Sequence, residues 1–200
     1  MKAAIMGYGT IGSGVYEVLD RNCKIVEKKA GEPIKVKYIL DLREFPGTPI
    51  EKLVIHDVKT IVDDPEIGIV VETMGGTTPA YEFVKSCLLA GKHVVTSNKA
   101  LVAAHGTELI RIAAEKNVSF LFEASVGGGI PIIRPLVECL GGEEIEEISG
   151  ILNGTTNYIL TKMNEEGWSF EEALKRAQEL GYAERNPEAD VEGYDTCRKI

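Results

Sequence analysis

A glycine-rich hexapeptide near the amino terminus, Gly7-Tyr8-Gly9-Thr10-Ile11-Gly12, constrains the fold of this chain most strongly. It follows a short apolar run, Lys2–Met6, which predicts a buried strand, and it opens the helical pattern of Ile11–Lys29. In a strand–turn–helix unit the first glycine permits a tight turn and the second lets the backbone approach a pyrophosphate. The third allows the helix to pack closely on the strand.

This G-x-G-x-x-G pattern is weak by itself, but its position between a strand and a helix favours dinucleotide binding. The alternative is a tight turn that binds nothing. The helix N-terminus would supply partial positive charge for a phosphate. The residues that we expect to contact the cofactor here are Gly7, Gly9, Thr10, Ile11 and Gly12.

Strand and helix patterns alternate along the first 130 residues. Further strands are predicted at Val36–Leu40, Ile67–Glu72, Val94–Thr96 and Val118–Glu123, and helices at Pro79–Ala90 (with Gly91 as its stop) and Gly106–Glu115. Continuous apolar strands that alternate with helices indicate a parallel sheet covered on both faces. We therefore predict an α/β fold, a Rossmann-type doubly wound parallel sheet over residues 1–130.

The pattern changes after the three glycines at 127–129. A helix over Ile130–Leu140 begun by Pro131, a strand over Glu143–Leu152, and helices over Gly154–Asn164 and Ser169–Leu180 are expected. Ser169 and Glu172 have the spacing of a capping box. We expect residues 131–200 to form part of an α+β substrate and dimerisation lobe.

Composition narrows the function classes. The 31 acidic residues outnumber 22 basic ones, for a net charge of −9, which argues against nucleic acid or an anionic membrane as a partner. Neither a signal peptide nor an apolar run of the ~20 residues that span a bilayer is evident, so a cytoplasmic protein is expected. Four dispersed cysteines and three isolated histidines make disulfides, a cysteine zinc site and a histidine-led site improbable.

Asp41 ends the second predicted strand, where a carboxylate can accept hydrogen bonds from the ribose hydroxyls of NAD. It lies 29 residues beyond Gly12 (41 − 12), a longer separation than usual, which the long first helix accounts for. A carboxylate there disfavours the 2′-phosphate of NADP, but Arg43 could offset this effect. NAD is favoured, and NADP stays open.

Three further motifs resemble one family. They are Thr96-Ser97-Asn98-Lys99-Ala100-Leu101-Val102-Ala103, then Leu152-Asn153-Gly154-Thr155-Thr156-Asn157-Tyr158-Ile159-Leu160, and Gly181-Tyr182-Ala183-Glu184 continuing to Asp190-Val191-Glu192-Gly193-Tyr194-Asp195-Thr196-Cys197-Arg198-Lys199. With the glycine loop, in this order, they resemble homoserine dehydrogenases over the whole chain. The resemblance implies NAD(P)-dependent interconversion of L-aspartate 4-semialdehyde and L-homoserine, in threonine, methionine and isoleucine biosynthesis.

The resemblance also implies roles for single residues. Lys199 would transfer the proton that accompanies hydride transfer, and Asp195, four residues earlier on one helix face, would orient it and hold substrate. Lys99, at the carboxyl edge of the sheet, would reach substrate or the nicotinamide ribose. Glu184 would bind the substrate ammonium. The alternatives are a surface ion pair for Asp195 and Lys199 and a solvated lysine at position 99.

Other residues follow from position or resemblance. Thr155 lies in a helix start that either binds the substrate carboxylate or is only well capped. Gly75 and Gly181 are expected beside the cofactor. The resemblance implies a sodium ion bound by the backbone carbonyls of Glu123, Val126, Gly128 and Ile130, with a flexible hinge as the alternative.

The sequence ends at Ile200, one residue after Lys199, whereas the family continues well beyond this point. We therefore expect a truncated chain, and an NAD(P)-binding fragment without activity is a second hypothesis. A third is another amino-acid-pathway dehydrogenase, such as an aspartate dehydrogenase, which explains the last two motifs poorly. The resemblance further suggests a homodimer, in which the Glu143–Leu152 strand pairs across a two-fold axis.

Overall fold

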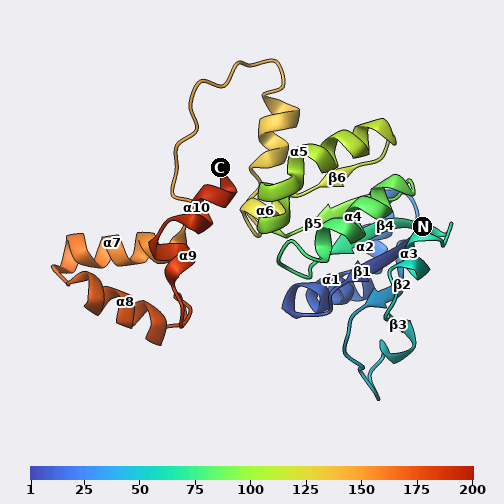
Figure 1. Cartoon of the computed structure of the whole chain (residues 1–200), viewed down its shortest axis with the longest axis horizontal. Coiled ribbons are helices and arrows are strands. Elements are labelled where there is room, and N and C mark those ends of the chain that lie inside the picture. The colour runs from blue at the N-terminus through green and yellow to red at the C-terminus, as the bar shows by residue number, and fades with distance from the viewer. The chain divides into compact units, whose positions relative to one another are not determined.

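A computed structural model describes all residues, 1–200, as two compact units, Met1–Cys139 and Leu140–Ile200. Figure 1 follows the chain through the elements of both units. None of its helices combines the length and the apolar character needed to cross a lipid bilayer.

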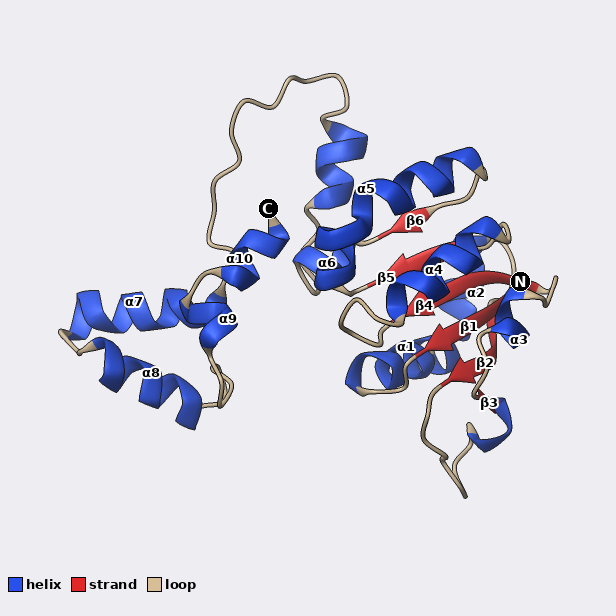
Figure 2. Ribbon diagram, viewed as in Figure 1, coloured by secondary structure: helices blue, strands red, loops and turns tan.

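The first unit is built on one parallel sheet of six strands, drawn in red in Figure 2. In spatial order the strands are β3 (Val54–Ile55), β2 (Lys35–Leu40), β1 (Lys2–Met6), β4 (Ile67–Glu72), β5 (His93–Thr96) and β6 (Phe120–Leu121). The order reverses between β1 and β4, and all five pairings are parallel. The predicted doubly wound α/β sheet is confirmed.

The helices of this unit are α1 (Thr10–Arg21), α2 (Cys23–Ala30), α3 (Lys59–Val62), α4 (Ala80–Leu89), α5 (Lys99–Glu115) and α6 (Glu123–Val126). They cover two separate apolar cores because successive strand residues point to opposite faces of a sheet. In β1, Ala4 and Met6 pack in the core that includes buried residues of α3, α4 and α5. Ile5, between them, packs in the other core with Val15 of α1.

Several boundaries differ from the prediction. The expected helix Ile11–Lys29 is two helices, because Asn22, with ψ of 19°, leaves the helical conformation between α1 and α2. Asparagine is a poor helix former whose side chain competes for backbone hydrogen bonds. β3 and α3 were not predicted, since two and four residues are too few to show a period. The predicted strand Val118–Glu123 is shorter, because Glu123 already begins α6.

The start of α5 was also predicted too late. The helix begins at Lys99 and not at Gly106, because the side chain of Asn98 caps it by accepting a hydrogen bond from the Leu101 amide at 3.1 Å. The predicted stop of α4 at Gly91 is confirmed by the positive φ of this glycine, +77°. Of the helix expected over Ile130–Leu140, only its later part forms, ending in the π-helical turn η2 (Pro135–Cys139).

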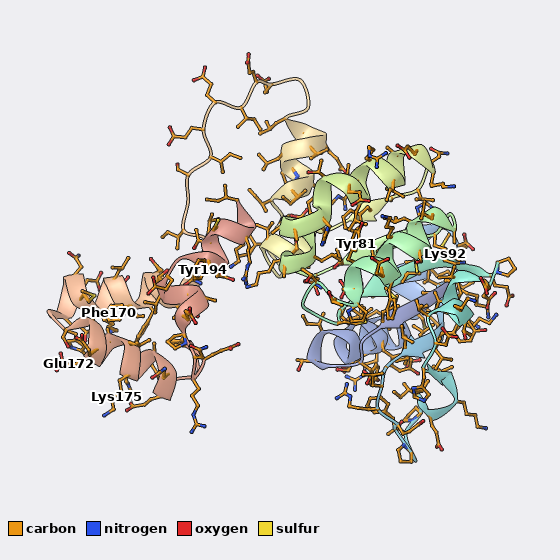
Figure 3. All side chains as sticks on the ribbon, viewed as in Figure 1. Tyr81, Lys92, Phe170, Glu172, Lys175 and Tyr194 are labelled. Carbon is orange, nitrogen blue, oxygen red and sulfur yellow. The ribbon has the colours of Figure 1, made fainter.

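The second unit is helical. It contains α7 (Gly154–Glu166), α8 (Phe170–Glu179), α9 (Glu188–Val191) and α10 (Tyr194–Lys199). α7 and α8 pack on a small core of Ile159, Ala173, Ala177 and Ala183. The capping box of Ser169 and Glu172 at the start of α8 is confirmed, and Figure 3 labels Phe170 and Glu172 there.

The strand predicted over Glu143–Leu152 is wrong for this structure, so the second unit lacks the strand component of the expected α+β lobe. Ile145, Ile148 and Ile151 lie exposed in a segment without regular structure. A strand needs a neighbour for its backbone hydrogen bonds, and no other strand exists in this unit.

Candidate functional site

A cleft of about 570 Å³ opens at the carboxyl ends of the central strands. Its walls come from the glycine loop after β1, from the end of β2 and from the loop after β4. Open parallel sheets bind ligands at this edge, where the strand order reverses. Four of the residues expected beside a cofactor line this cleft: Gly7, Gly9, Asp41 and Gly75.

The glycine loop has the geometry that its sequence predicts. Gly7 has φ of +92°, a conformation that residues with a side chain rarely adopt. A Cβ atom on Gly12 would lie 2.0 Å from the carbonyl oxygen of Gly7, so only glycine fits at this crossing. A Cβ on Gly9 would meet nothing within 4 Å, which leaves the backbone there open to a ligand.

The first turn of α1 has no side-chain cap. Gly9 is its N-cap and cannot supply an acceptor, whereas Asn98, Asn153 and Ser169 cap α5, α7 and α8 with their side chains. Thr10 and Ile11 are the first two residues of α1, so their amides belong to the group that has no partner within a helix. Such an N-terminus binds phosphate well.

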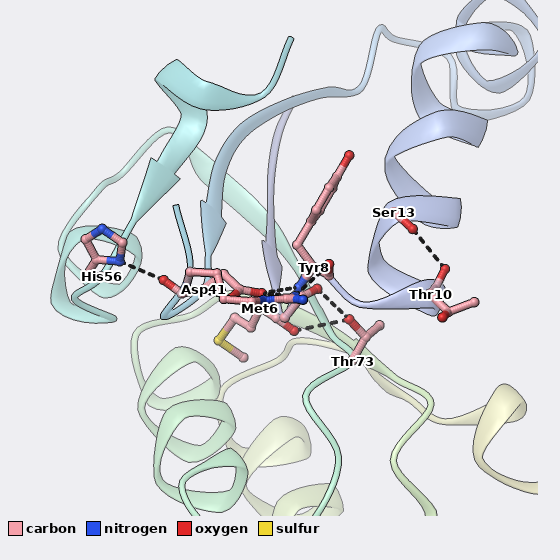
Figure 4. A network of polar contacts seen from close by, with 9 residues as sticks. Met6, Tyr8, Thr10, Ser13, Asp41, His56 and Thr73 are labelled. Atoms are coloured by element: carbon pink, nitrogen blue, oxygen red, sulfur yellow. Dashed lines mark hydrogen bonds and ion pairs between the residues drawn. The ribbon is translucent and has the colours of Figure 1, made fainter. Parts of the chain in front are cut away.

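Asp41 is confirmed at the end of β2, and its carboxylate is fully engaged (Figure 4). One oxygen, Oδ2, accepts from the Tyr8 amide at 2.8 Å and from Arg43 Nη2 at 2.9 Å. The other, Oδ1, accepts from the Arg43 amide at 3.0 Å and Nε at 2.9 Å. These four donors use the lone pairs of both oxygens. The Arg43 hydrogen bonds hold the pKa of Asp41 far below its ordinary value, so the group is ionised.

His56 also lines the cleft, although, as an isolated histidine, it had no expected role. Its Nδ1 lies 2.7 Å from the Asp41 carbonyl oxygen and its Nε2 lies 2.7 Å from Glu44 Oε1 (Figure 4 shows the first contact). These contacts, the Asp41 carbonyl first, raise the pKa of His56 above its ordinary 6.5. No sequence signal indicates this placement, because the strand that brings His56 to this edge, β3, has only two residues and ends immediately before it.

The remaining residues of the cleft edge follow β4 and β5. Thr73 donates from its hydroxyl to the Gly7 carbonyl at 2.8 Å and so ties the glycine loop to β4. Gly75, two residues on, has φ of +80°. Lys99 is confirmed just after β5, as the first residue of α5.

In the second unit the two residues assigned to proton transfer lie together. Lys199 Nζ is 2.8 Å from Asp195 Oδ2 and donates to the Leu152 carbonyl at 2.7 Å. The Asp195 side chain is 5% exposed and that of Lys199 is 18% exposed. The exposure is too low for the solvated surface pair that was the alternative.

Asn153 organises this pair. Its Oδ1 accepts from the Thr156 amide at 2.8 Å and thereby caps α7. Its Nδ2 donates to Asp195 Oδ2 at 2.9 Å and to Asp190 Oδ1 at 2.8 Å. One amide therefore joins the start of α7 to two carboxylates from the end of the chain. Asp190 belongs to the last of the family motifs, but the sequence alone indicates no role for it.

The other expected residues of this unit occupy diverse environments. Thr155 is buried and its hydroxyl donates to the Tyr182 carbonyl at 2.8 Å. Glu184 is exposed, and its backbone carbonyl accepts from Gln178. Gly181 follows α8 with φ of +78°, a conformation that suits a helix end.

The segment expected to bind sodium begins as helix α6. The Glu123 carboxylate accepts hydrogen bonds from the amides of Ile132, Ile133 and Arg134 at 2.5, 2.8 and 2.8 Å. These amides hold the pKa of Glu123 below its ordinary value. Of the four residues expected as carbonyl ligands, Val126 ends α6, and Gly128 and Ile130 follow in an exposed turn.

Residues 7–123, more than half of the chain, match the family model described as "Homoserine dehydrogenase, NAD binding domain". The chain belongs to the homoserine dehydrogenase family. Residues 131–200 match a second model of the family, described as "Homoserine dehydrogenase".

Individual relatives agree with this assignment. The chain is 47% identical to a homoserine dehydrogenase of a Synechocystis species, over all of this chain and 46% of the relative. It is 43% identical to the crystal structure of a homoserine dehydrogenase from Thiobacillus denitrificans, with a TM-score of 0.88, over all of this chain and 47% of the other. A hyperthermophilic archaeal homoserine dehydrogenase in complex with NADPH is 30% identical, with a TM-score of 0.84, over 99% of this chain and 66% of the other. The chain spans about half the length of the curated relatives it matches.

As a member of the homoserine dehydrogenase family, the chain has an NAD-binding domain in its first unit, with Gly7, Gly9, Asp41 and Gly75 in one cleft. Its second unit brings Asp195 and Lys199 together. Lys99 belongs to the first unit and Glu184 to the second.

Proposed function

We propose that these residues act in an NAD(P)-dependent homoserine dehydrogenase, which interconverts L-aspartate 4-semialdehyde and L-homoserine for threonine, methionine and isoleucine biosynthesis. Residues 1–130 are the proposed dinucleotide-binding domain, and residues 131–200 are part of the catalytic and dimerisation domain. The observation that carries the proposal is the ion pair of buried Asp195 with partly buried Lys199, which also contact Asn153 and the Leu152 carbonyl, respectively.

The pair suits proton transfer to and from a substrate oxygen. The nicotinamide ring, when bound, supplies or accepts the hydride. Lys199 donates a proton to the aldehyde oxygen when the semialdehyde is reduced, and takes it from the hydroxyl when homoserine is oxidised. Asp195 and the Leu152 carbonyl fix the ammonium by two hydrogen bonds, at 2.8 and 2.7 Å, so that its third proton remains for the substrate.

The other substrate contacts are proposed from residue chemistry. The exposed carboxylate of Glu184 binds the substrate ammonium, and Thr155 at the start of α7 contacts the substrate carboxylate. Lys99, at the start of α5, binds substrate or the nicotinamide ribose. Gly181 lies beside the cofactor in this proposal.

For the cofactor, we propose that the cleft binds either dinucleotide. Asp41 accepts ribose hydroxyl hydrogen bonds, for which the 60%-exposed Arg43 side chain must give up some of its contacts. The same guanidinium can pair with a 2′-phosphate. The archaeal relative with bound NADPH supports the second mode.

Homoserine-dependent reduction of NAD⁺ or NADP⁺ by the purified chain, followed by absorbance, tests the activity. Lys199→Ala should lower turnover by about 10²–10⁴-fold while NADH binding persists. Lys175→Ala, at an exposed lysine of α8, is the matched control and should leave turnover unchanged. Near-normal turnover of the Lys199 variant would remove this residue from its role. A chain that binds NADH but never turns over homoserine would instead favour a dinucleotide-binding module.

A second copy of the chain is the proposed partner. Ile145, Ile148 and Ile151 are exposed in a segment without regular structure, which supports an apolar contact of residues 143–152 with a second copy. Light scattering should give a dimer mass that Ile148→Glu lowers to that of the monomer. An unchanged dimer in this variant would place the interface elsewhere.

The remaining proposals concern the ion and the compartment. Sodium bound by the carbonyls of Glu123, Val126, Gly128 and Ile130 should raise the melting temperature in sodium chloride over that in an equal concentration of potassium chloride. Equal melting temperatures would argue against this site. We place the enzyme in the cytoplasm because its four cysteines are all free, as in a reducing compartment.

A further inference from the structure

Glu72 is a charged residue in an unusual place. It is the last residue of β4, its side chain is completely buried, and all of its hydrogen-bond partners are neutral. A buried carboxylate without a cation is costly, so its presence calls for several well-aligned donors. The proposed reaction gives this residue no task.

The donors to Glu72 come from the loop after β4, from the last residue of β5 and from the residues that follow β5. Its Oε1 accepts from the Met74 amide at 2.7 Å, within the loop that follows β4. Its Oε2 accepts from the Thr96 hydroxyl at 2.5 Å, at the end of β5. The side-chain nitrogen of Asn98, Nδ2, is the third donor and lies 3.4 Å from Oε1.

Asn98 extends the connection. Its Nδ2 donates to the Gly76 carbonyl at 2.6 Å, while its Oδ1 caps α5. The same side chain therefore joins the β4 loop to the helix that begins with Lys99. Thr96 Oγ1 accepts from the Asn98 amide at 2.9 Å, so the hydroxyl proton is directed to Glu72.

The loop held in this way has little stability of its own. Gly75 and Gly76 have φ of +80° and +68°, and a glycine pair loses more backbone entropy on ordering than other residues. Met74 and Gly75 nevertheless line the cleft. A fixed acceptor beneath this loop reduces the entropy that ligand binding must remove.

We infer that Glu72 is a positioning residue, whose buried carboxylate fixes the loop after β4 and the start of α5 in the conformation that binds the dinucleotide. The inference rests on the proposed function of the cleft. Glu72 contacts no ligand in this role. Its loss therefore weakens cofactor binding through Met74, Gly75 and Asn98.

Binding of NADH to the purified chain, measured by fluorescence, tests the inference with two variants and a control. Glu72→Ala removes all the acceptors, and Glu72→Gln keeps the shape but presents a donor to the Thr96 hydroxyl. Val70→Ala, at an equally buried position in the same strand, opens a cavity without touching either loop. We expect the dissociation constant of NADH to rise at least tenfold in Glu72→Ala and about threefold or more in Glu72→Gln. Val70→Ala should stay within twofold of the wild type.

Equal NADH affinities of Glu72→Gln and Val70→Ala at matched melting temperatures would overturn the inference. If Glu72→Ala does not fold, Glu72→Gln alone provides the test. Amide NMR shifts separate this result from failure of the proposed cleft. Even in a chain that binds no NADH, Glu72→Gln should move the Gly75, Gly76 and Asn98 amide resonances and leave that of Gly9 in place. Unmoved Gly75 and Gly76 resonances would refute the positioning role.

Discussion

Replacement of Gly12 by alanine would place a Cβ atom 2.0 Å from the carbonyl oxygen of Gly7 and 2.9 Å from Thr73 Oγ1. The first distance must grow by about 1 Å to reach the 3.0 Å limit that real contacts respect. The obstacle is backbone, so either α1 or the glycine loop must move. Movement of the loop strains the Thr73–Gly7 hydrogen bond of 2.8 Å and the Gly7 amide bond to the Leu40 carbonyl, also 2.8 Å.

The magnitude follows from these terms. Overpacking typically costs about 1–3 kcal/mol, and a weakened hydrogen bond adds about 1 kcal/mol. Alanine within a helix returns about 1 kcal/mol relative to glycine. We therefore expect Gly12→Ala to lower the free energy of unfolding by about 1–3 kcal/mol, and to weaken NADH binding at least tenfold because the loop is displaced.

Urea unfolding followed by circular dichroism measures the stability, and fluorescence titration measures NADH affinity. Gly14→Ala is a matched control, since it makes the same change in the same helix and its Cβ would meet nothing within 4 Å. This control should raise the free energy of unfolding by up to about 1 kcal/mol and leave NADH affinity unchanged. If Gly12→Ala proved as stable as Gly14→Ala, the close approach at Gly12 would not constrain this fold.

Three further outcomes are expected. Asp41→Ala should weaken the binding of NAD more than that of NADP, because it removes the acceptor for the ribose hydroxyls and frees Arg43 to pair with a 2′-phosphate. An unchanged ratio of the two dissociation constants would mean that Asp41 does not contact the ribose. Burial raises the pKa of the Cys87 thiol to about 12, so a thiol reagent should titrate only the three exposed cysteines until urea is added; four fast thiols would contradict this. Because the pKa of His56 is raised, its contacts stabilise the fold fully below pH 6.5 and lose this effect as the pH rises through the raised pKa. The free energies of unfolding of the wild type and of His56→Gln should therefore converge at alkaline pH. A difference that does not depend on pH would disprove the linkage.

The sheet and the glycine loop could be predicted from sequence because local signals determine them. Five of the six strands showed as apolar runs, and the spacing of the loop glycines indicated the two positions, Gly7 and Gly12, where a side chain does not fit. The capping box at Ser169 is likewise a local pattern of two side chains. Such features depend on neighbours within a few residues.

Features that depend on distant partners were harder to predict. His56 reaches the cleft only because the two-residue strand β3 pairs with Ile39 and Leu40, and so short a strand leaves no periodic signal. Asn153 could be predicted as a helix cap, but its second contact is with Asp195, 42 residues away. The strand prediction for residues 143–152 was wrong because apolar spacing within a segment does not show whether a partner strand exists.

Because Ala4 and Met6 pack in one core and Ile5 in the other, β1 contributes side chains to both layers of the first unit. Neither layer can open without exposing a face of this strand, which β2 and β4 also bracket on both edges. Amide exchange in β1 should therefore proceed only through global unfolding of the unit. Gly7 follows β1 directly, and its amide donates to the Leu40 carbonyl of β2. The glycine loop is therefore attached to the strand whose amides should exchange most slowly.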